Sequence, residues 1–280
     1  MPEWVAVSRT QHADRHYQPR QGYRFAAEQP VTSILLAELG KLLPHYALGF
    51  VQQGESAYQS YQPVALLGLN GQQNLYLHPD GRWLGTYVPA SLRGYPFTLA
   101  NTEDQQQVLC IAQDHLLEGE QGEPLFDEQG QLEQRVQQTL GFLQECEKNR
   151  QLTQAAAGVL GDTGVIEPWP LKVERGEGQE PLKVNGLYRV NEKALNALDA
   201  DTYATLRGGP MALAYAQLFS MSQLTQLSER AKFHAEHGAT QDVPENLDSV
   251  LDGMDDEACT RHLCEIKGVG RWTAQMFLMF

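Results

Sequence analysis

The chain has 280 residues, of which 42% are apolar and 20% charged, so it can bury one large core or a core with a small appendage. Disorder throughout is excluded, and with 14 Pro and 25 Gly residues so is a collagen-like chain. Acidic residues outnumber basic ones by 35 to 21, which gives a net charge of −14. That charge disfavours binding of nucleic acid or anionic lipid unless a local basic patch overrides it.

The sequence predicts a soluble protein, because no apolar run approaches the roughly 20 residues of a membrane-spanning helix. Its amino-terminal segment lacks the apolar stretch and the cleavage site of a signal peptide. We therefore expect a cytoplasmic location, and the cell surface only through a signal-independent export route. Four cysteines, Cys110, Cys146, Cys259 and Cys264, are too sparse for a disulfide framework and are expected as reduced thiols.

The first half of the chain predicts a short helix followed by a meander of strands. Residues 33–43 have the apolar pattern of an amphipathic helix that ends at Pro44. Short apolar and aromatic runs follow, separated by Asn-Gly and Pro-Asp-Gly sequences that favour tight turns. The predicted strands are 64–69, 74–78, 82–88 and 107–111, and a polar loop is predicted at 118–130.

The second half is mainly helical in pattern. From Leu132 the apolar residues recur at helical spacing, which predicts a helix that ends before a breaker segment at 161–170. Two strands are expected to pair around a Gly-rich turn, and a long helix is expected to begin at Pro210 and end near Gly238. The paired strands are predicted at 171–173 and 182–190, and a further helix at 192–207.

These elements predict an α+β fold in which a small antiparallel or mixed sheet packs against amphipathic helices. We expect one domain over residues 1–238, because no Pro/Gly/Ser-rich linker interrupts it. Residues 239–257 predict an acidic linker, since seven carboxylates and no Lys or Arg lie between Gln241 and Glu257. Residues 258–280 predict a separate helix-hairpin-helix segment.

The run PVALLGLNGQQNLYLHPDGRWLGTYVPASLRGYPFTLA at residues 63–100 resembles the SapC family of bacterial proteins. Shorter matches surround it in family order, at 11–14, 122–127, 186–190, 216–221 and 244–250 and in the segment YRFAAEQPV. The resemblance implies a family named for a surface-layer-associated protein, with no catalytic mechanism attached. We therefore expect a non-enzymatic protein of the surface layer or envelope, with an unidentified protein or envelope partner.

Charged and aromatic side chains gather in one stretch of this block, at His78, Asp80, Arg82, Trp83, Arg93 and Tyr95. Arg82, Trp83, Arg93 and Tyr95 are the candidate ligand-binding residues, because an arginine beside aromatic rings can bind a carboxylate or a sugar. The alternative, which we favour, is that the rings are core and rim residues over which the arginines pack. A small-molecule or glycan-handling enzyme centred on Arg82–Phe97 would need a closed pocket lined by Arg93 and Tyr95.

Two sets of residues have the types but not the arrangement of a metal site. His12, Asp14 and His16 lie in a polar terminus, where such side chains are mostly solvated. The C-terminal set, Cys259, His262 and Cys264, offers no fourth ligand, and on a helix Cys264 would point away from the other two. With no phosphate-binding loop or nucleophile elbow either, we predict no metal, no cofactor and no catalytic residue.

The C-terminal sequence LCEIKGVGRWTAQMFLMF resembles the helix-hairpin-helix of alkyladenine-type DNA glycosylases. The resemblance implies that Gly268 and Gly270 allow a close backbone approach to a DNA strand, with Lys267 and Arg271 near its phosphates. The family's catalytic aspartate would lie beyond Phe280, so we expect at most a weak DNA contact and no glycosylase activity. A DNA-binding or base-excision-repair-related protein is the second alternative function.

Overall fold

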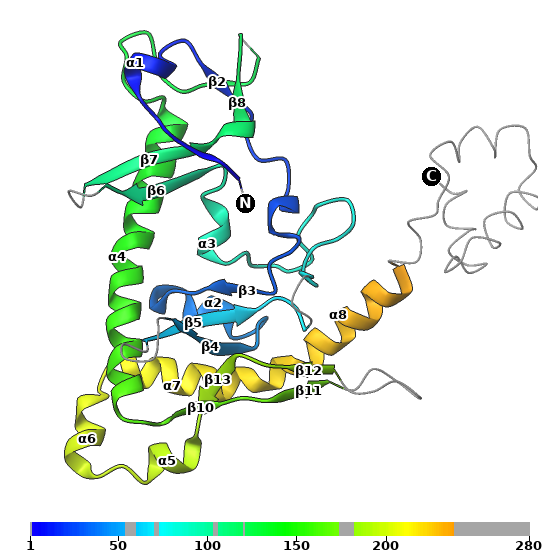
Figure 1. Ribbon diagram of the computed structural model, residues 1–280, viewed down its shortest axis with the longest axis vertical. Helices are drawn as coiled ribbons and strands as arrows, with labels where there is room; N and C mark the ends of the chain where they lie inside the picture. Colours follow the sequence, from blue (N-terminus) through cyan, green and yellow to red (C-terminus); the bar gives the residue numbers. More distant parts are fainter. Residues whose placement is uncertain are drawn as a thin grey trace, which may run out of the picture. The chain divides into compact units, whose positions relative to one another are not determined.

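The computed structural model describes residues 2–53, 60–69, 73–102, 106–119, 121–173 and 182–237. The chain divides into two compact units, Met1–Leu227 and Ser228–Phe280. The first unit combines helices with small antiparallel sheets, which confirms the predicted α+β fold (Figure 1). None of the helices in the described ranges has the length and apolar character needed to cross a membrane.

The largest sheet has five strands in the order β10-β13-β4-β5-β3. These strands are β3 (Val31–Ser33), β4 (Leu48–Gln53), β5 (Ser60–Leu66), β10 (Ile166–Pro168) and β13 (Leu187–Val190). Its centre is the antiparallel pair β4 and β5, which runs in register from Leu48 opposite Ala65 to Gln53 opposite Ser60. Residues 62–66 of β5 are all buried rather than alternately exposed, as expected for a strand that is covered on both faces.

Two helices pack against this sheet, α4 (Gln134–Asp162) and α7 (Gly209–Ser220). The buried Gln217 of α7 joins two strands, because its side chain accepts from Val190 N at 2.9 Å and donates to Leu48 O at 3.3 Å. Ser220 accepts from Leu48 N at 2.9 Å. These side chains satisfy backbone groups that burial would otherwise leave unpaired.

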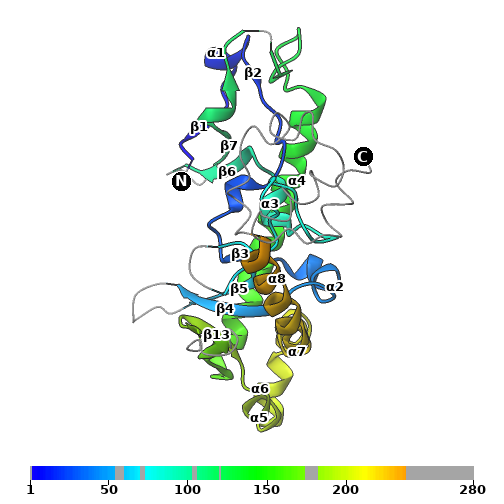
Figure 2. The same ribbon diagram turned by 90° about the vertical axis from the view of Figure 1, so that its right-hand side faces the viewer.

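The amino-terminal half of α4 packs against a second core, which lies between two three-stranded sheets (Figure 2). One sheet consists of β1 (Trp4–Ala6), β7 (Gln107–Ala112) and β6 (Phe97–Asn101), and the other of β8 (Leu116–Leu117), β2 (His16–Tyr17) and β9 (Glu123–Pro124). Val136 of α4 is fully buried there, and Tyr17 meets Phe97 edge to face at 4.9 Å. The single long helix thus serves both cores.

Shorter elements complete the described chain. The predicted pairing of 171–173 with 182–190 is confirmed in its first part, since Leu171 pairs with Val184 and Val173 with Leu182. The single strand predicted at 182–190 is wrong, because the chain turns at Gly186, which has φ +83°, and the residues after it form β13 of the five-stranded sheet. The elements are α1 (Arg9–His12), η1 (Arg24–Ala26), η2 (Leu36–Glu38), α2 (Leu39–Leu42), α3 (Ala90–Arg93), η3 (Gln113–His115), β11 (Leu171–Val173), β12 (Leu182–Val184), α5 (Glu192–Asn196), α6 (Ala200–Thr205), η4 (Met221–Gln223) and α8 (Leu224–His237).

The predicted strands 74–78 and 82–88 are wrong. Only one isolated bridge, between Leu77 and Trp83, joins these segments. Asn74 is the physical reason, because its buried side chain accepts from Tyr76 N at 2.9 Å and donates to Ala26 O at 3.0 Å. Side chain to backbone bonds of this kind compete with a strand ladder, so this apolar stretch is buried in an irregular conformation.

The predicted helices at 33–43, 192–207 and from Pro210 are broken into shorter pieces. Ser33 ends a strand, so the first helix is only the two turns η2 and α2. Asp199 starts a new helix inside 192–207, because its side chain accepts from the backbone N–H of Asp201 and Thr202. The 3₁₀ turn η4 interrupts the helix that begins near Pro210. The predicted boundary at 238 and the segments beyond it lie outside the described residues.

Candidate functional site

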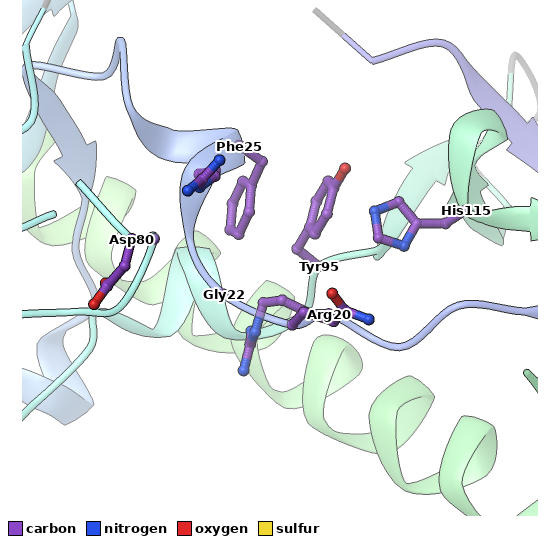
Figure 3. Close-up of a pocket in the computed structure, with 9 residues that line it drawn as sticks. Arg20, Gly22, Phe25, Asp80, Tyr95 and His115 are labelled. Carbon is purple, nitrogen blue, oxygen red and sulfur yellow. The ribbon is translucent and has the colours of Figure 1, made fainter. Parts of the chain in front are cut away.

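An open pocket of about 420 Å³ lies beside the aromatic segment that the sequence singled out (Figure 3). Four parts of the chain form it: the segment around η1, the turn at 80–81, the residues before β6, and η3. Its lining residues are Arg20, Gln21, Gly22, Arg24, Phe25, Asp80, Gly81, Tyr95 and His115. Two arginines, an aromatic pair and one carboxylate therefore share one concave surface.

Two glycines bring the first two parts together. Tyr23 N donates to Gly81 O at 2.8 Å, and a Cβ on Gly22 would come within 2.7 Å of that oxygen. Gly81 itself has φ +94°, a conformation that other residues rarely adopt. Arg24 reinforces the contact, since its Nη2 donates to Pro79 O at 3.1 Å. The segment around η1 is thus fixed against the turn at 80–81.

The rings of Phe25 and Tyr95 stack at 3.9 Å with an interplanar angle of 8°. Figure 3 shows them face to face, with Asp80 on the Phe25 side and His115 on the Tyr95 side. His115 meets Tyr95 edge on at 4.9 Å, and its Nδ1 donates to Gln18 O at 2.6 Å because a carbonyl oxygen can only accept. Burial, and to a smaller extent the charge of Asp114, raises the pKa of Tyr95, so its hydroxyl stays neutral.

The two arginines keep part of their hydrogen-bonding capacity. Arg20 Nη1 donates to the carbonyls of Leu92 at 3.2 Å and Arg93 at 3.0 Å, and its guanidinium lies 4.4 Å from the centre of the Tyr23 ring. Arg24 donates through Nη2 to Pro79 O. A guanidinium carries five N–H donors, so within the described chain the Nε and one terminal nitrogen of each arginine have no protein acceptor.

Asp80 is ionised and its charge is compensated from outside the pocket. Its Oδ1 accepts from Arg82 N at 2.9 Å, and its Oδ2 lies 3.0 Å from Arg82 Nε and 2.9 Å from His78 Nδ1. The backbone hydrogen bond from Arg82 is the main cause that lowers the pKa of Asp80. The charges of Arg20 and Arg24 therefore leave the pocket electropositive in a chain of net charge −14.

The four residues predicted to bind a ligand do not share this pocket. Tyr95 lines it, whereas Arg82 is not a lining residue and contacts it only through its ion pair with Asp80. Trp83 donates from Nε1 to the Tyr46 hydroxyl at 3.0 Å. Arg93 packs over the Tyr87 ring at 5.4 Å and the Phe142 ring at 4.9 Å. The contacts of Trp83 and Arg93 are those of the packing alternative.

A buried carboxylate organises this neighbouring group. Glu38 is only 4% exposed. Its Oε1 accepts from Leu35 N at 3.0 Å, and its Oε2 accepts from the Tyr87 hydroxyl and from Ala90 N, both at 2.8 Å. Burial, with the hydrogen bond to Glu38, strongly raises the pKa of Tyr87. The Tyr46 hydroxyl in turn donates to the Tyr87 carbonyl. Glu38, Tyr46, Trp83, Tyr87 and Arg93 are called the Glu38 cluster below.

Sequence reasoning missed Arg20, Arg24, Phe25 and His115. The signal for the first three was an alternation of basic and aromatic residues in RQGYRF at 20–25. Only its last three residues belong to the segment YRFAAEQPV, and the family resemblance assigns them no role. No pattern in the sequence marks His115, because it reaches Tyr95 only through the folding of β7 and the turn η3 that follows it.

The residue sets considered as metal ligands are not assembled in the described chain. His12 is buried and accepts from Ser8 N at 3.0 Å, and no group of three or more His, Cys, Asp or Glu in the described ranges is placed to hold a metal ion. Cys259, His262 and Cys264 lie outside those ranges. So do the predicted DNA-contacting residues Lys267, Gly268, Gly270 and Arg271, which remain a prediction.

Comparison with known proteins gives one match. The family model described as SapC matches residues 7–227, which include every residue of the pocket and of the Glu38 cluster. No curated protein and no solved structure matches the chain.

Proposed function

Because this chain belongs to the SapC family, we propose that it is a non-enzymatic binding protein of the surface layer or envelope that holds a small anionic ligand. The family is named for a surface-layer-associated protein, and this supports the proposed location at the surface layer or envelope. One observation carries the binding role: Arg20 and Arg24 line an open pocket with N–H donors to spare, beside a stacked aromatic pair. Donors of this kind form strong, directional bonds with anions.

The Glu38 cluster supports binding rather than catalysis. A general acid or base must reach the substrate and exchange a proton with it. Glu38 is instead buried and accepts three hydrogen bonds from the protein, and one of its donors is the hydroxyl of Tyr87. Glu38 and Tyr87 thus hold the residues before η2 against the start of α3.

Co-sedimentation with envelope material tests the proposal. Purified full-length protein is mixed with a protein-depleted envelope fraction of the producing bacterium and pelleted at increasing salt. We expect saturable sedimentation that weakens with salt and falls at least tenfold in Arg24→Gln. The matched control Arg207→Gln removes an exposed arginine outside the pocket and should sediment as the wild type does.

Two results would overturn the proposal. The first is a protein that stays in the supernatant at all concentrations of the envelope fraction. The second is sedimentation that Arg24→Gln leaves unchanged, because the pocket would then play no part in it. Mass spectrometry of the recovered ligand adds a check on the non-enzymatic role, which predicts an unaltered ligand.

A further inference from the structure

The donors of the pocket suit a carboxylate. Each guanidinium presents a planar fork of N–H groups that matches the two oxygens of such a group. Arg24 uses one nitrogen to bond Pro79 O, and Arg20 uses one to bond the carbonyls that end α3. Both side chains are therefore anchored at one nitrogen, which lowers the entropic cost of presenting the others to a ligand.

Asp80 limits the charge that the pocket accepts. Its carboxylate lines the same surface as the arginines and is kept ionised by its hydrogen bond from Arg82 N. The repulsion from this carboxylate is about twice as large for a dianion such as phosphate as for a monoanion. The Asp80 side chain is 52% exposed, however, so its oxygens can accept hydrogen bonds from hydroxyl groups of a ligand. A monoanion that carries hydroxyls fits this pair of constraints.

The aromatic pair adds a flat apolar surface. Tyr95 covers one face of the Phe25 ring at 3.9 Å, and the opposite face is directed toward the Asp80 side of the pocket (Figure 3). A pyranose ring has a face of C–H groups that packs on such a ring, while its hydroxyls point outward at the edges. The volume of about 420 Å³ lies in the range of small-ligand sites and suffices for one or two sugar units.

We propose that the pocket binds an acidic sugar, a pyranose with one carboxylate, an assignment that rests on the proposed binding function. The carboxylate lies between Arg20 and Arg24, the ring packs on Phe25, and a ring hydroxyl donates to Asp80. None of these roles falls to the segment Arg82–Phe97 except the stacking of Tyr95 behind Phe25.

Calorimetric titration of the full-length protein with methyl α-galacturonoside, a pyranose with one carboxylate, tests this assignment. Its methyl ester is the matched probe, because it keeps the ring and the hydroxyls and loses only the charge. The acid should bind at least tenfold more tightly than the ester. Arg24→Gln should weaken binding of the acid at least tenfold and leave the ester unchanged, Phe25→Leu should weaken both, and Arg207→Gln should weaken neither.

Equal affinity for the acid and its ester would overturn the carboxylate assignment. Arg24-dependent binding of inorganic phosphate, with no binding of the galacturonoside, would overturn the assignment of a sugar. Affinity unaffected by Arg24→Gln would place the sugar elsewhere. The two proposals can fail separately: if Arg24-dependent sedimentation with the envelope fraction persists while the galacturonoside does not bind, only the acidic-sugar assignment is lost.

Discussion

The pocket and the Glu38 cluster contain the same kinds of residue and differ in what their polar atoms bond to. In the Glu38 cluster the carboxylate accepts three hydrogen bonds and Trp83 Nε1 has the Tyr46 hydroxyl as acceptor. In the pocket, the hydrogen bonds of Arg20 and of Arg24 to the described part of the chain each use a single nitrogen. An arginine beside aromatic residues therefore indicates a binding site only where some of its N–H donors remain for a ligand. The residue types alone do not show whether they do.

Removal of the Glu38 carboxylate should have the largest effect on stability. Glu38→Ala leaves Leu35 N, Ala90 N and the Tyr87 hydroxyl without their acceptor. We expect the free energy of unfolding to fall by about 3 kcal/mol, since buried donors that lose their partner cost about 1–3 kcal/mol each. Denaturant unfolding measures this, with Glu145→Ala on the exposed face of α4 as the control. A loss below about 1 kcal/mol would show that the cluster does not hold the fold.

Removal of the Tyr46 hydroxyl should have the next largest effect on the free energy of unfolding. Tyr46→Phe removes the acceptor of Trp83 Nε1 and the donor to the Tyr87 carbonyl, while the ring remains in place. We expect a loss of about 2 kcal/mol in the free energy of unfolding. Tyr23→Phe is the matched control, because within the described chain the Tyr23 hydroxyl has no hydrogen-bond partner. Equal effects of the two substitutions would contradict this account.

The reactivity of the Cys146 thiol tests how well the region of the Glu38 cluster is shielded from solvent. Burial raises its pKa from 9.0 to about 11, and the thiolate is the reactive form. A raised pKa stabilises the fold below pH 9, and this contribution is lost as the pH rises from 9 through 11. At pH 8 we expect iodoacetamide to modify Cys146 at least about tenfold more slowly in the folded chain than in urea.

Peptide mapping by mass spectrometry distinguishes Cys146 from the other thiols. The pH profile supplies the check on the cause, because the folded-state rate should climb steeply between pH 9 and 11 while the rate in urea levels off. Equal rates at pH 8 in the two states would show that the thiol is open to solvent and that the cluster is looser than its contacts indicate.

Much of the fold is predictable from local pattern. The helical period from Leu132 gives the long helix α4, and the apolar run at 107–111 gives β7, because both depend on the spacing of apolar residues. The stretch 74–88 is not predictable in this way. Its apolar residues are buried, yet the side chain of Asn74 takes over hydrogen bonds that a strand partner would make.

The candidate site is less predictable, because it depends on contacts between distant segments. Its neighbours in sequence make Tyr95 a candidate, but its stacking partner Phe25 lies 70 residues away along the chain. Arg93 and Arg24 both lie close to aromatic residues in the sequence. Only the three-dimensional contacts show that Arg93 packs over Tyr87 and Phe142 while Arg24 lines the pocket.

The most direct test of the difference between the two regions is a paired measurement on Arg24→Gln and Arg93→Gln. Each variant is assayed for its free energy of unfolding and for sedimentation with the envelope fraction. We predict that Arg93→Gln lowers stability by about 1 kcal/mol through lost cation–π contacts and keeps binding. Arg24→Gln should lose binding and stay within about 0.5 kcal/mol of the wild type. If the two variants behave alike in both assays, or exchange these roles, the assignment of binding to the pocket and of stability to the Glu38 cluster is wrong.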